Sequence, residues 1–166
     1  MQMALGLFIV VLCLTSGLWI GANGQCGKSS GSTCDSCPSG WTRFGQRCFM
    51  FQANEMEWAD AERFCTSLCG NLASIRSAVD YGFMRQLIYQ ATNSHKTTWV
   101  GGNDAVKEGV WMWSDGTNFV FSDWGKGEPN NLGGENCMEI NLGGQDYVND
   151  SKCNNKRSFL CAKDAS

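Results

Sequence analysis

The sequence has a single histidine, His95, among its 166 residues, and it lacks the usual signatures of catalysis. No Ser/His/Asp order, no H-E-x-x-H motif and no phosphate-binding loop is present. A lone histidine leaves general-base catalysis with one candidate that has no evident partner. We therefore predict that the protein is not an enzyme.

Positive charge is also scarce. Thirteen Lys and Arg residues stand against sixteen Asp and Glu residues, which gives a net charge of −3. Proteins that bind nucleic acids usually carry a basic patch or stripe. The charge balance therefore predicts no nucleic-acid partner.

A long apolar run occurs only at the start of the chain, from Met3 to Ile20. Ala22 and Gly24 follow it and fit the small-residue positions of a signal-peptidase site. We predict a signal peptide over residues 1–24, cleavage before Gln25, and a secreted, extracellular protein without membrane insertion. An uncleaved membrane anchor is the alternative, because the run is nearly long enough to cross a bilayer.

Cysteine, in contrast, is abundant, with ten residues in the chain. This number predicts a disulfide framework formed in an oxidising compartment. Cys13 would leave with the signal peptide, and the odd number that remains indicates an intermolecular bridge or a free thiol. Residues 25–36 are rich in Cys, Gly and Ser and have no hydrophobic period, so we predict an N-terminal segment ahead of one domain over residues 37–166.

The hydrophobic pattern predicts helices first and short strands later. Residues 55–68 and 77–91 carry apolar side chains at three- and four-residue spacing, and Ser77 is a candidate N-cap for the second helix. We predict strands at residues 47–51, 99–100, 110–113, 137–140, 147–148 and 158–161. Such an order in one small unit is typical of the α+β class.

The stretch from Glu128 to Asp150 gathers oxygen-bearing side chains among glycines. The candidate ligands are Glu128, Asn130, Glu135, Asn149 and Asp150. Carboxylate and amide oxygens are what a hard cation such as Ca²⁺ prefers. The stretch therefore predicts a cation site that can also hold a polar ligand, and the alternative is a solvated polar loop without a bound ion.

Several of these residues together resemble a C-type lectin-like domain. The resemblance runs in order from Cys37 to the end of the chain, through Cys37-x10-Cys48, Cys65, Trp99-Val100-Gly101-Gly102, Glu128-Pro129-Asn130, Cys137, Val148-Asn149-Asp150, Cys153 and Cys161. The chain is most similar to soluble fish lectins, such as the lactose-binding lectins of eel skin mucus. The resemblance implies a fold with two helices flanking small antiparallel sheets and a long disulfide-tied loop region.

The resemblance also implies how most of the cysteines pair. It implies three bridges, namely Cys37–Cys48, Cys65–Cys161 and Cys137–Cys153. Cys26, Cys34 and Cys69 lie outside the family pattern and cannot all pair with one another within one chain. We predict a disulfide-linked homodimer or higher oligomer through one of them.

The same resemblance implies that Glu128, Asn130, Glu135, Asn149 and Asp150 hold Ca²⁺ and the hydroxyls of a sugar, with the Glu128–Pro129 bond cis. In such a site carboxylates accept hydrogen bonds from hydroxyls while amides donate them. A second calcium site of some relatives would use Asp104, Glu108, Asn131, Glu135 and Asn136. We predict that this second site is weak or absent, since two of its positions are amides where acids are usual.

The class of sugar follows from two conflicting features of the resemblance. The tripeptide Glu128-Pro129-Asn130 usually accompanies mannose-type sugars, whereas the likeness along the whole domain favours β-galactosides such as lactose. We predict a galactoside-binding lectin that recognises glycans on cell or bacterial surfaces and agglutinates them in mucosal defence, with mannose-type specificity as the alternative. A type II antifreeze protein of the same fold is a further alternative.

Overall fold

The computed structural model describes residues 37–165, and this part of the chain holds two α-helices and eight strands. In chain order they are β1 (Thr42–Phe44), β2 (Arg47–Met56), α1 (Trp58–Ser67), β3 (Asn71–Leu72), α2 (Ala78–Thr92), β4 (Thr98–Asn103), β5 (Met112–Trp113), β6 (Cys137–Ile140), the 3₁₀ turn η1 (Leu142–Gly144), β7 (Val148–Ser151) and β8 (Arg157–Asp164). The predicted α+β class is confirmed. The predicted signal peptide 1–24 and the segment 25–36 lie outside the described residues.

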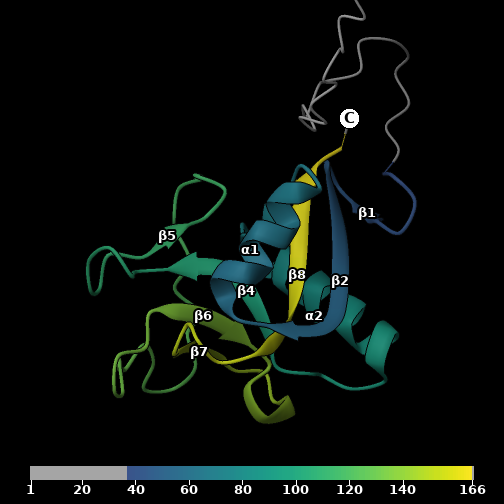
Figure 1. Cartoon of the computed structure of the whole chain (residues 1–166). Coiled ribbons are helices and arrows are strands. Elements are labelled where there is room, and N and C mark those ends of the chain that lie inside the picture. The colour runs from purple at the N-terminus through teal and green to yellow at the C-terminus, as the bar shows by residue number, and fades with distance from the viewer. Residues whose placement is uncertain (1–36, 166) are drawn as a thin grey trace, which may run out of the picture.

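The strands form one mixed sheet in the order β1-β2-β8-β4-β6-β7, with β3 paired to β8 and β5 paired to β4 (Figure 1). Most neighbours are antiparallel, but β4 runs parallel to β8, with Thr98 opposite Ser158. The small antiparallel sheets that the resemblance implies are joined here into one mixed sheet with a single parallel pair. A parallel pair needs a crossover connection, and the sequence pattern of short strands does not reveal which strands will be neighbours.

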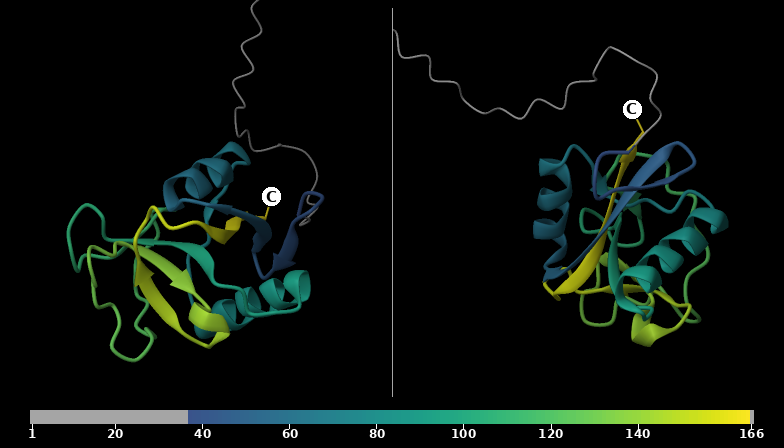
Figure 2. Two further views of the ribbon diagram at one scale, coloured as in Figure 1. Left: turned by 60° about the horizontal axis from the view of Figure 1, so that its bottom comes forward. Right: turned by 90° about the vertical axis from the view of Figure 1, so that its right-hand side faces the viewer.

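The two helices lie on opposite sides of the long β2–β8 ribbon, as the right-hand view of Figure 2 shows. The side chains of Ala61 and Cys65 on α1 pack in one apolar cluster that contains Trp99 and Phe159. On the other side, α2 contributes Met84 and Ile88 to a second cluster, which includes Phe49, Val100, Met138 and Leu160. Burial of these faces fixes the sheet whose far edge, β6 and β7, carries the loops considered below.

The first helix begins later than predicted, because β2 continues to Met56, which pairs with Arg157 of β8. At its end, the left-handed residue is not the glycine Gly70 but the residue before it. Cys69 adopts that conformation, with φ of 61°, while the Gly70 N–H donates to the Cys65 carbonyl and the Cys69 N–H to Thr66. These two bonds form a Schellman motif. The prediction for α2 is confirmed, with the Ser77 hydroxyl accepting the Asp80 N–H at its start.

Three disulfides join Cys37 to Cys48, Cys65 to Cys161 and Cys137 to Cys153. These are the pairs that the family resemblance implies. Cys69 is disulfide-bonded as well, while Cys26 and Cys34 lie outside the described residues. Across residues 37–165, no helix has the length and apolar character needed to cross a membrane.

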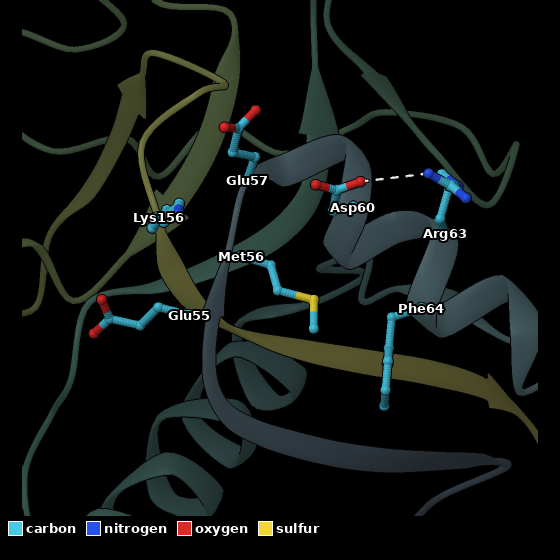
Figure 3. Close-up of a pocket in the computed structure, with 7 residues that line it drawn as sticks. All are labelled: Glu55, Met56, Glu57, Asp60, Arg63, Phe64 and Lys156. Atoms are coloured by element: carbon cyan, nitrogen blue, oxygen red, sulfur yellow. Dashed lines mark ion pairs between the residues drawn. The ribbon is translucent and has the colours of Figure 1, made fainter.

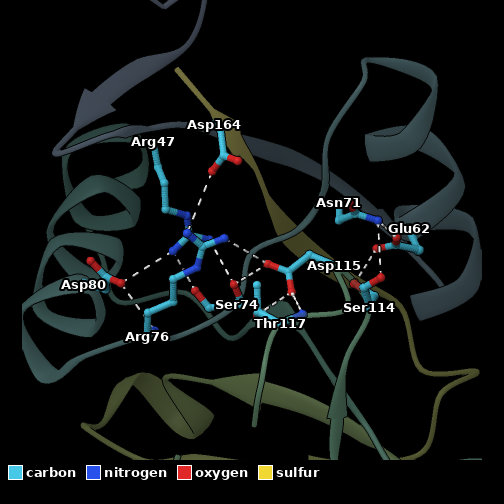
Figure 4. A network of polar contacts seen from close by, with 10 residues as sticks. All are labelled: Arg47, Glu62, Asn71, Ser74, Arg76, Asp80, Ser114, Asp115, Thr117 and Asp164. Atoms are coloured by element: carbon cyan, nitrogen blue, oxygen red, sulfur yellow. Dashed lines mark hydrogen bonds and ion pairs between the residues drawn. The ribbon is translucent and has the colours of Figure 1, made fainter. Parts of the chain in front are cut away.

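A buried polar network fastens α2 to the sheet (Figure 4). The Arg47 guanidinium donates to the carbonyl and the hydroxyl of Ser74, and it pairs with Asp80 at 3.5 Å. Burial and the neighbouring Arg76 lower the pKa of Arg47 to about 10. Burial alone would raise the pKa of Asp115, but hydrogen bonds from neighbours that include the Ser74 hydroxyl outweigh it and hold that pKa below 3.8.

Candidate functional site

The candidate site lies at the edge of the sheet where β6 and β7 pair. Their antiparallel register sets Met138 opposite Asp150 and Glu139 opposite Asn149. The loop that precedes β6 carries the other predicted ligands, and the Cys137–Cys153 disulfide joins the start of β6 to the segment after β7. The Glu128–Pro129 peptide bond in this loop is cis.

The Asp150 carboxylate anchors the loop to β7. It is almost fully buried and accepts the backbone N–H groups of Asn130 and Asn131 at 3.0 and 2.7 Å. At the tip of the loop, the Leu132 N–H donates to Asn130 Oδ1 at 2.8 Å and to Glu135 Oε2 at 3.1 Å. The fold therefore brings Asn130, Glu135 and Asp150 together through backbone N–H groups.

Glu128 joins the same group of side chains through electrostatics. Burial raises the pKa of its carboxyl, and the adjacent Asp150 and Glu135 carboxyls raise it further. Burial and the charge of Asp150 likewise raise the pKa of Glu135. One oxygen, Glu128 Oε2, is buried without a hydrogen-bond partner among the described residues. Three acidic groups that repel one another, with one oxygen unsatisfied, would be stabilised by a cation.

Asn149 is linked to the other ligands less directly. Its amide Nδ2 donates to Glu139 Oε1 at 3.1 Å, and Arg157 Nε donates to the other oxygen of the same carboxylate at 2.8 Å. Glu139 is only 1% exposed, so its charge depends on these two donors. The bond from Asn149 to Glu139 orients the amide, but no hydrogen bond joins Asn149 to the remaining four predicted ligands in the described part of the chain.

The donor set suits a calcium ion. The Glu128 carboxyl, with its unsatisfied Oε2, has the Asp150 and Glu135 carboxyls as neighbours, and carboxylate oxygens are ligands that Ca²⁺ prefers. The arrangement is not a finished cage, because within residues 37–165 no three acidic, histidine or cysteine side chains already stand as a metal site. The residues thus fit the ion in chemistry and in neighbourhood.

The predicted second calcium site has a different character. The amide Nδ2 of Asn136 donates to Asp104 Oδ1 at 2.9 Å and to Glu108 Oε2 at 3.3 Å. The Asn131 amide donates to the same Glu108 oxygen at 2.6 Å, and the Gly109 N–H donates to Asp104 Oδ2. Amide donors therefore occupy the carboxylates of Asp104 and Glu108 that a second ion would need. The weak or absent second site stays a prediction, and an ion there would have to displace these donors.

Two residues at the site were not predicted from the sequence. Glu139 orients Asn149, and Tyr147 places its hydroxyl 3.2 Å from Glu128 Oε1. The only available signal for Glu139 is a charged residue in the otherwise apolar run Cys137-Met138-Glu139-Ile140. Tyr147 gives no signal, because an aromatic residue beside a strand is usually read as core.

A cavity of about 540 Å³ lies elsewhere, at the start of α1 (Figure 3). It is lined by Glu55, Met56, Glu57, Asp60, Arg63, Phe64 and Lys156, and none of the predicted ligands borders it. The charges there are exposed and partly paired, as Asp60 and Arg63 are at 3.5 Å. Volume alone therefore does not mark the functional site, and the polar loop beside β7 remains the candidate.

Comparisons with known proteins agree on the family of the chain. A family model described as "Lectin C-type domain" matches residues 54–163. The galactose-specific lectin nattectin of Thalassophryne nattereri is 46% identical over 157 residues, which cover 94% of this chain and 95% of that protein. Ladderlectin of Oncorhynchus mykiss is 46% identical over 122 residues, which cover 73% of this chain and 64% of that protein. The solved structure of herring type II antifreeze protein has a TM-score of 0.73 and 33% identity, and the match covers 78% of this chain and 100% of that one.

Proposed function

The chain belongs to the C-type lectin domain family, and we propose that it is a secreted lectin that binds β-galactosides such as lactose at the loop from Glu128 to Asp150. The lectins that it is similar to are non-enzymatic carbohydrate-binding proteins, which confirms that the protein is not an enzyme. The observation that carries the proposal is the convergence of Glu128, Asn130, Glu135 and Asp150 on one face of the β6–β7 edge.

The side chains of the loop suit a ligand rich in vicinal hydroxyls. When bound, Ca²⁺ supplies coordination positions for a pair of such hydroxyls. The carboxylates of Glu128 and Glu135 accept hydrogen bonds from the sugar, and the amides of Asn130 and Asn149 donate them. In Asn149 the bond from Nδ2 to Glu139 aims the carbonyl oxygen away from Glu139, which leaves that oxygen for the ion.

The galactoside class is supported by the similarity to a galactose-specific lectin, which extends over almost the whole chain. The tripeptide Glu128-Pro129-Asn130 supports mannose-type sugars instead. Competition decides between them: the protein is captured on a galactoside-coated and on a mannan-coated surface and eluted with lactose or mannose. We expect lactose to elute it and a chelator to abolish capture, while elution by mannose alone would establish the alternative.

Agglutination of cells or bacteria requires at least two sites in one particle. After removal of Cys13 with the signal peptide, nine cysteines remain, so at least one has no partner within its own chain. Because Cys69 and the six cysteines of the three bridges are bonded, Cys26 and Cys34 are the candidates for an interchain bridge. Linking two sites raises avidity by about 10²–10⁴. Electrophoresis should show a dimer without reductant and a monomer with reductant. A monomer under both conditions would contradict an interchain disulfide.

Ice binding is a second candidate, because the fold matches the whole of a herring type II antifreeze protein. Thermal hysteresis of the purified protein tests it directly. We expect no hysteresis at concentrations that saturate a galactoside surface. A clear freezing-point gap without sugar binding would favour this alternative.

A further inference from the structure

We propose that Tyr147 is a positioning residue that holds the Glu128 carboxylate for Ca²⁺, an inference that rests on the function proposed above. The Tyr147 hydroxyl lies 3.2 Å from Glu128 Oε1 and 2.7 Å from the carbonyl oxygen of Lys126. A phenol has one proton to donate, so the hydroxyl is shared between two acceptors that both belong to the turn of residues 125–128.

The ring of Tyr147 is fixed by close packing on the backbone. A Cβ atom added to Gly125 would overlap the ring, so the ring lies directly against the Gly125 Cα. The Gly125 N–H donates to the Val148 carbonyl at 2.8 Å, and the Glu128 N–H donates to the Gly125 carbonyl at 3.0 Å. Residues 125–128 and Tyr147 therefore form one hydrogen-bonded unit in which the hydroxyl and the Glu128 carboxyl face each other.

In this unit the two carboxylate oxygens of Glu128 have different surroundings. Oε1 receives the Tyr147 hydroxyl, whereas Oε2 is buried and has no donor within residues 37–165. With one oxygen held, the carboxylate loses rotamer freedom before any ion arrives, and less ordering remains to be done on binding. By holding Oε1, Tyr147 leaves Oε2 as the oxygen of Glu128 that is free to bind the cation.

The test is the replacement Tyr147→Phe in the full secreted protein, with the Ca²⁺ dissociation constant measured by calorimetry. The phenyl ring keeps its packing on Gly125, so only the hydroxyl is lost. We expect Ca²⁺ affinity to fall roughly 3- to 10-fold, which corresponds to about 0.7–1.4 kcal/mol. The matched control is Tyr81→Phe, since the Tyr81 hydroxyl also donates to a carboxylate, Asp146 Oδ1, at 2.7 Å but outside the site.

If Tyr147 only positions Glu128, the variants should show a specific pattern in addition to a lower Ca²⁺ affinity. At saturating Ca²⁺, the affinity of Tyr147→Phe for lactose should equal that of the wild type, because a positioning residue acts on the sugar only through the occupied ion site. A second variant, Gly125→Ala, keeps the hydroxyl but pushes the ring aside, and it should weaken Ca²⁺ binding by a similar factor. Unfolding temperatures in chelator should separate these effects from a general loss of stability.

The outcomes are distinguishable. Weaker Ca²⁺ binding in both site variants, with Tyr81→Phe unchanged, supports the role. Unchanged Ca²⁺ affinity in Tyr147→Phe, or an equal loss in the Tyr81→Phe control, overturns it while the lectin function stands. A wild-type protein that binds lactose without any measurable Ca²⁺ would remove the metal site itself, and one that binds neither would refute the proposed function.

Discussion

Replacing Asp150 by asparagine should separate the structural role of this residue from its role as a ligand. Both carboxylate oxygens accept a backbone N–H, from Asn130 and from Asn131. An asparagine offers one acceptor and turns an NH₂ group toward the second N–H. A buried donor without a partner costs about 1–3 kcal/mol. Relief of the repulsion with Glu128 and Glu135 offsets part of this cost, so we expect a metal-free destabilisation at the lower end of that range.

The response to Ca²⁺ should change more. At a Ca²⁺ concentration of about 100 times the dissociation constant, binding stabilises the wild type by about 2.7 kcal/mol. Mutation of a residue that only hydrogen-bonds a metal ligand can lower metal affinity by roughly 100-fold. Loss of the charge of a ligand itself should lower the Ca²⁺ affinity by at least as much. At the same concentration the variant then gains only about 0.4 kcal/mol. For a domain of this size we expect a rise in Tm of about 10 °C in the wild type and about 2 °C in Asp150→Asn.

Thermal unfolding followed by circular dichroism, in chelator and in Ca²⁺, measures both effects. Asp146→Asn is the matched control, because Asp146 is an exposed acid of the preceding turn that bonds Tyr81 and Arg85 and does not touch the loop. It should keep the full gain in Ca²⁺. If Asp150→Asn rises with Ca²⁺ as much as the wild type does, Asp150 is not a ligand and the assigned site is wrong.

Three further predictions concern the scaffold. The pKa of Asp115 is lowered by folding, so its contribution to stability is present above about pH 4 and is lost as the pH falls through the folded-state pKa. In urea titrations, the difference between wild type and Asp115→Asn should be full at pH 6 and should shrink as the pH falls below 4; a difference that does not depend on pH would contradict this. Gly70→Ala should lower the free energy of unfolding by about 1–3 kcal/mol, because its Cβ would lie 2.7 Å from the Ala162 carbonyl oxygen. Gly82→Ala, in an open position of α2, should raise it by up to about 1 kcal/mol. Equal effects of the two variants in urea unfolding would contradict this packing. Arg157→Met should lower the free energy of unfolding by about 3–5 kcal/mol, because Glu139 is left buried with only one donor. It should also weaken Ca²⁺ binding, because Glu139 orients the predicted ligand Asn149. An unchanged urea midpoint would show that Glu139 does not need the charge of Arg157.

The sequence alone predicts those parts of the fold that depend on local pattern. The Ser77 cap and the apolar stripe of α2 are local, and both are found in the structure. The end of β2 is not local, because residues up to Met56 are held in the strand by pairing with β8, about one hundred residues later. The parallel pairing of β4 with β8 is hidden for the same reason.

The site divides in the same way. Its five predicted ligands come from motif positions that the family resemblance identifies, and four of them meet through contacts of Asp150 and Leu132. Glu139 and Tyr147 could not be found, because each acts on a ligand through a contact that only the folded chain creates. The β6–β7 register brings Glu139 to Asn149, and the turn at Gly125 brings Tyr147 to Glu128.

The two acidic clusters of this domain show why residue type is a poor guide to where an ion binds. Asp104 and Glu108 have donors already, because the amides of Asn131 and Asn136 bond them. An ion there would have to break those hydrogen bonds, which offsets its own attraction. Around Glu128, burial and the neighbouring carboxylates raise the pKa of Glu128 and that of Glu135, and one oxygen of Glu128 is left unsatisfied. Asp150 and Glu135 also accept backbone N–H groups, but Glu128 Oε2 has no donor within residues 37–165. A cation beside Glu128 would therefore relieve an existing cost, which is why we propose the site there rather than at Asp104 and Glu108.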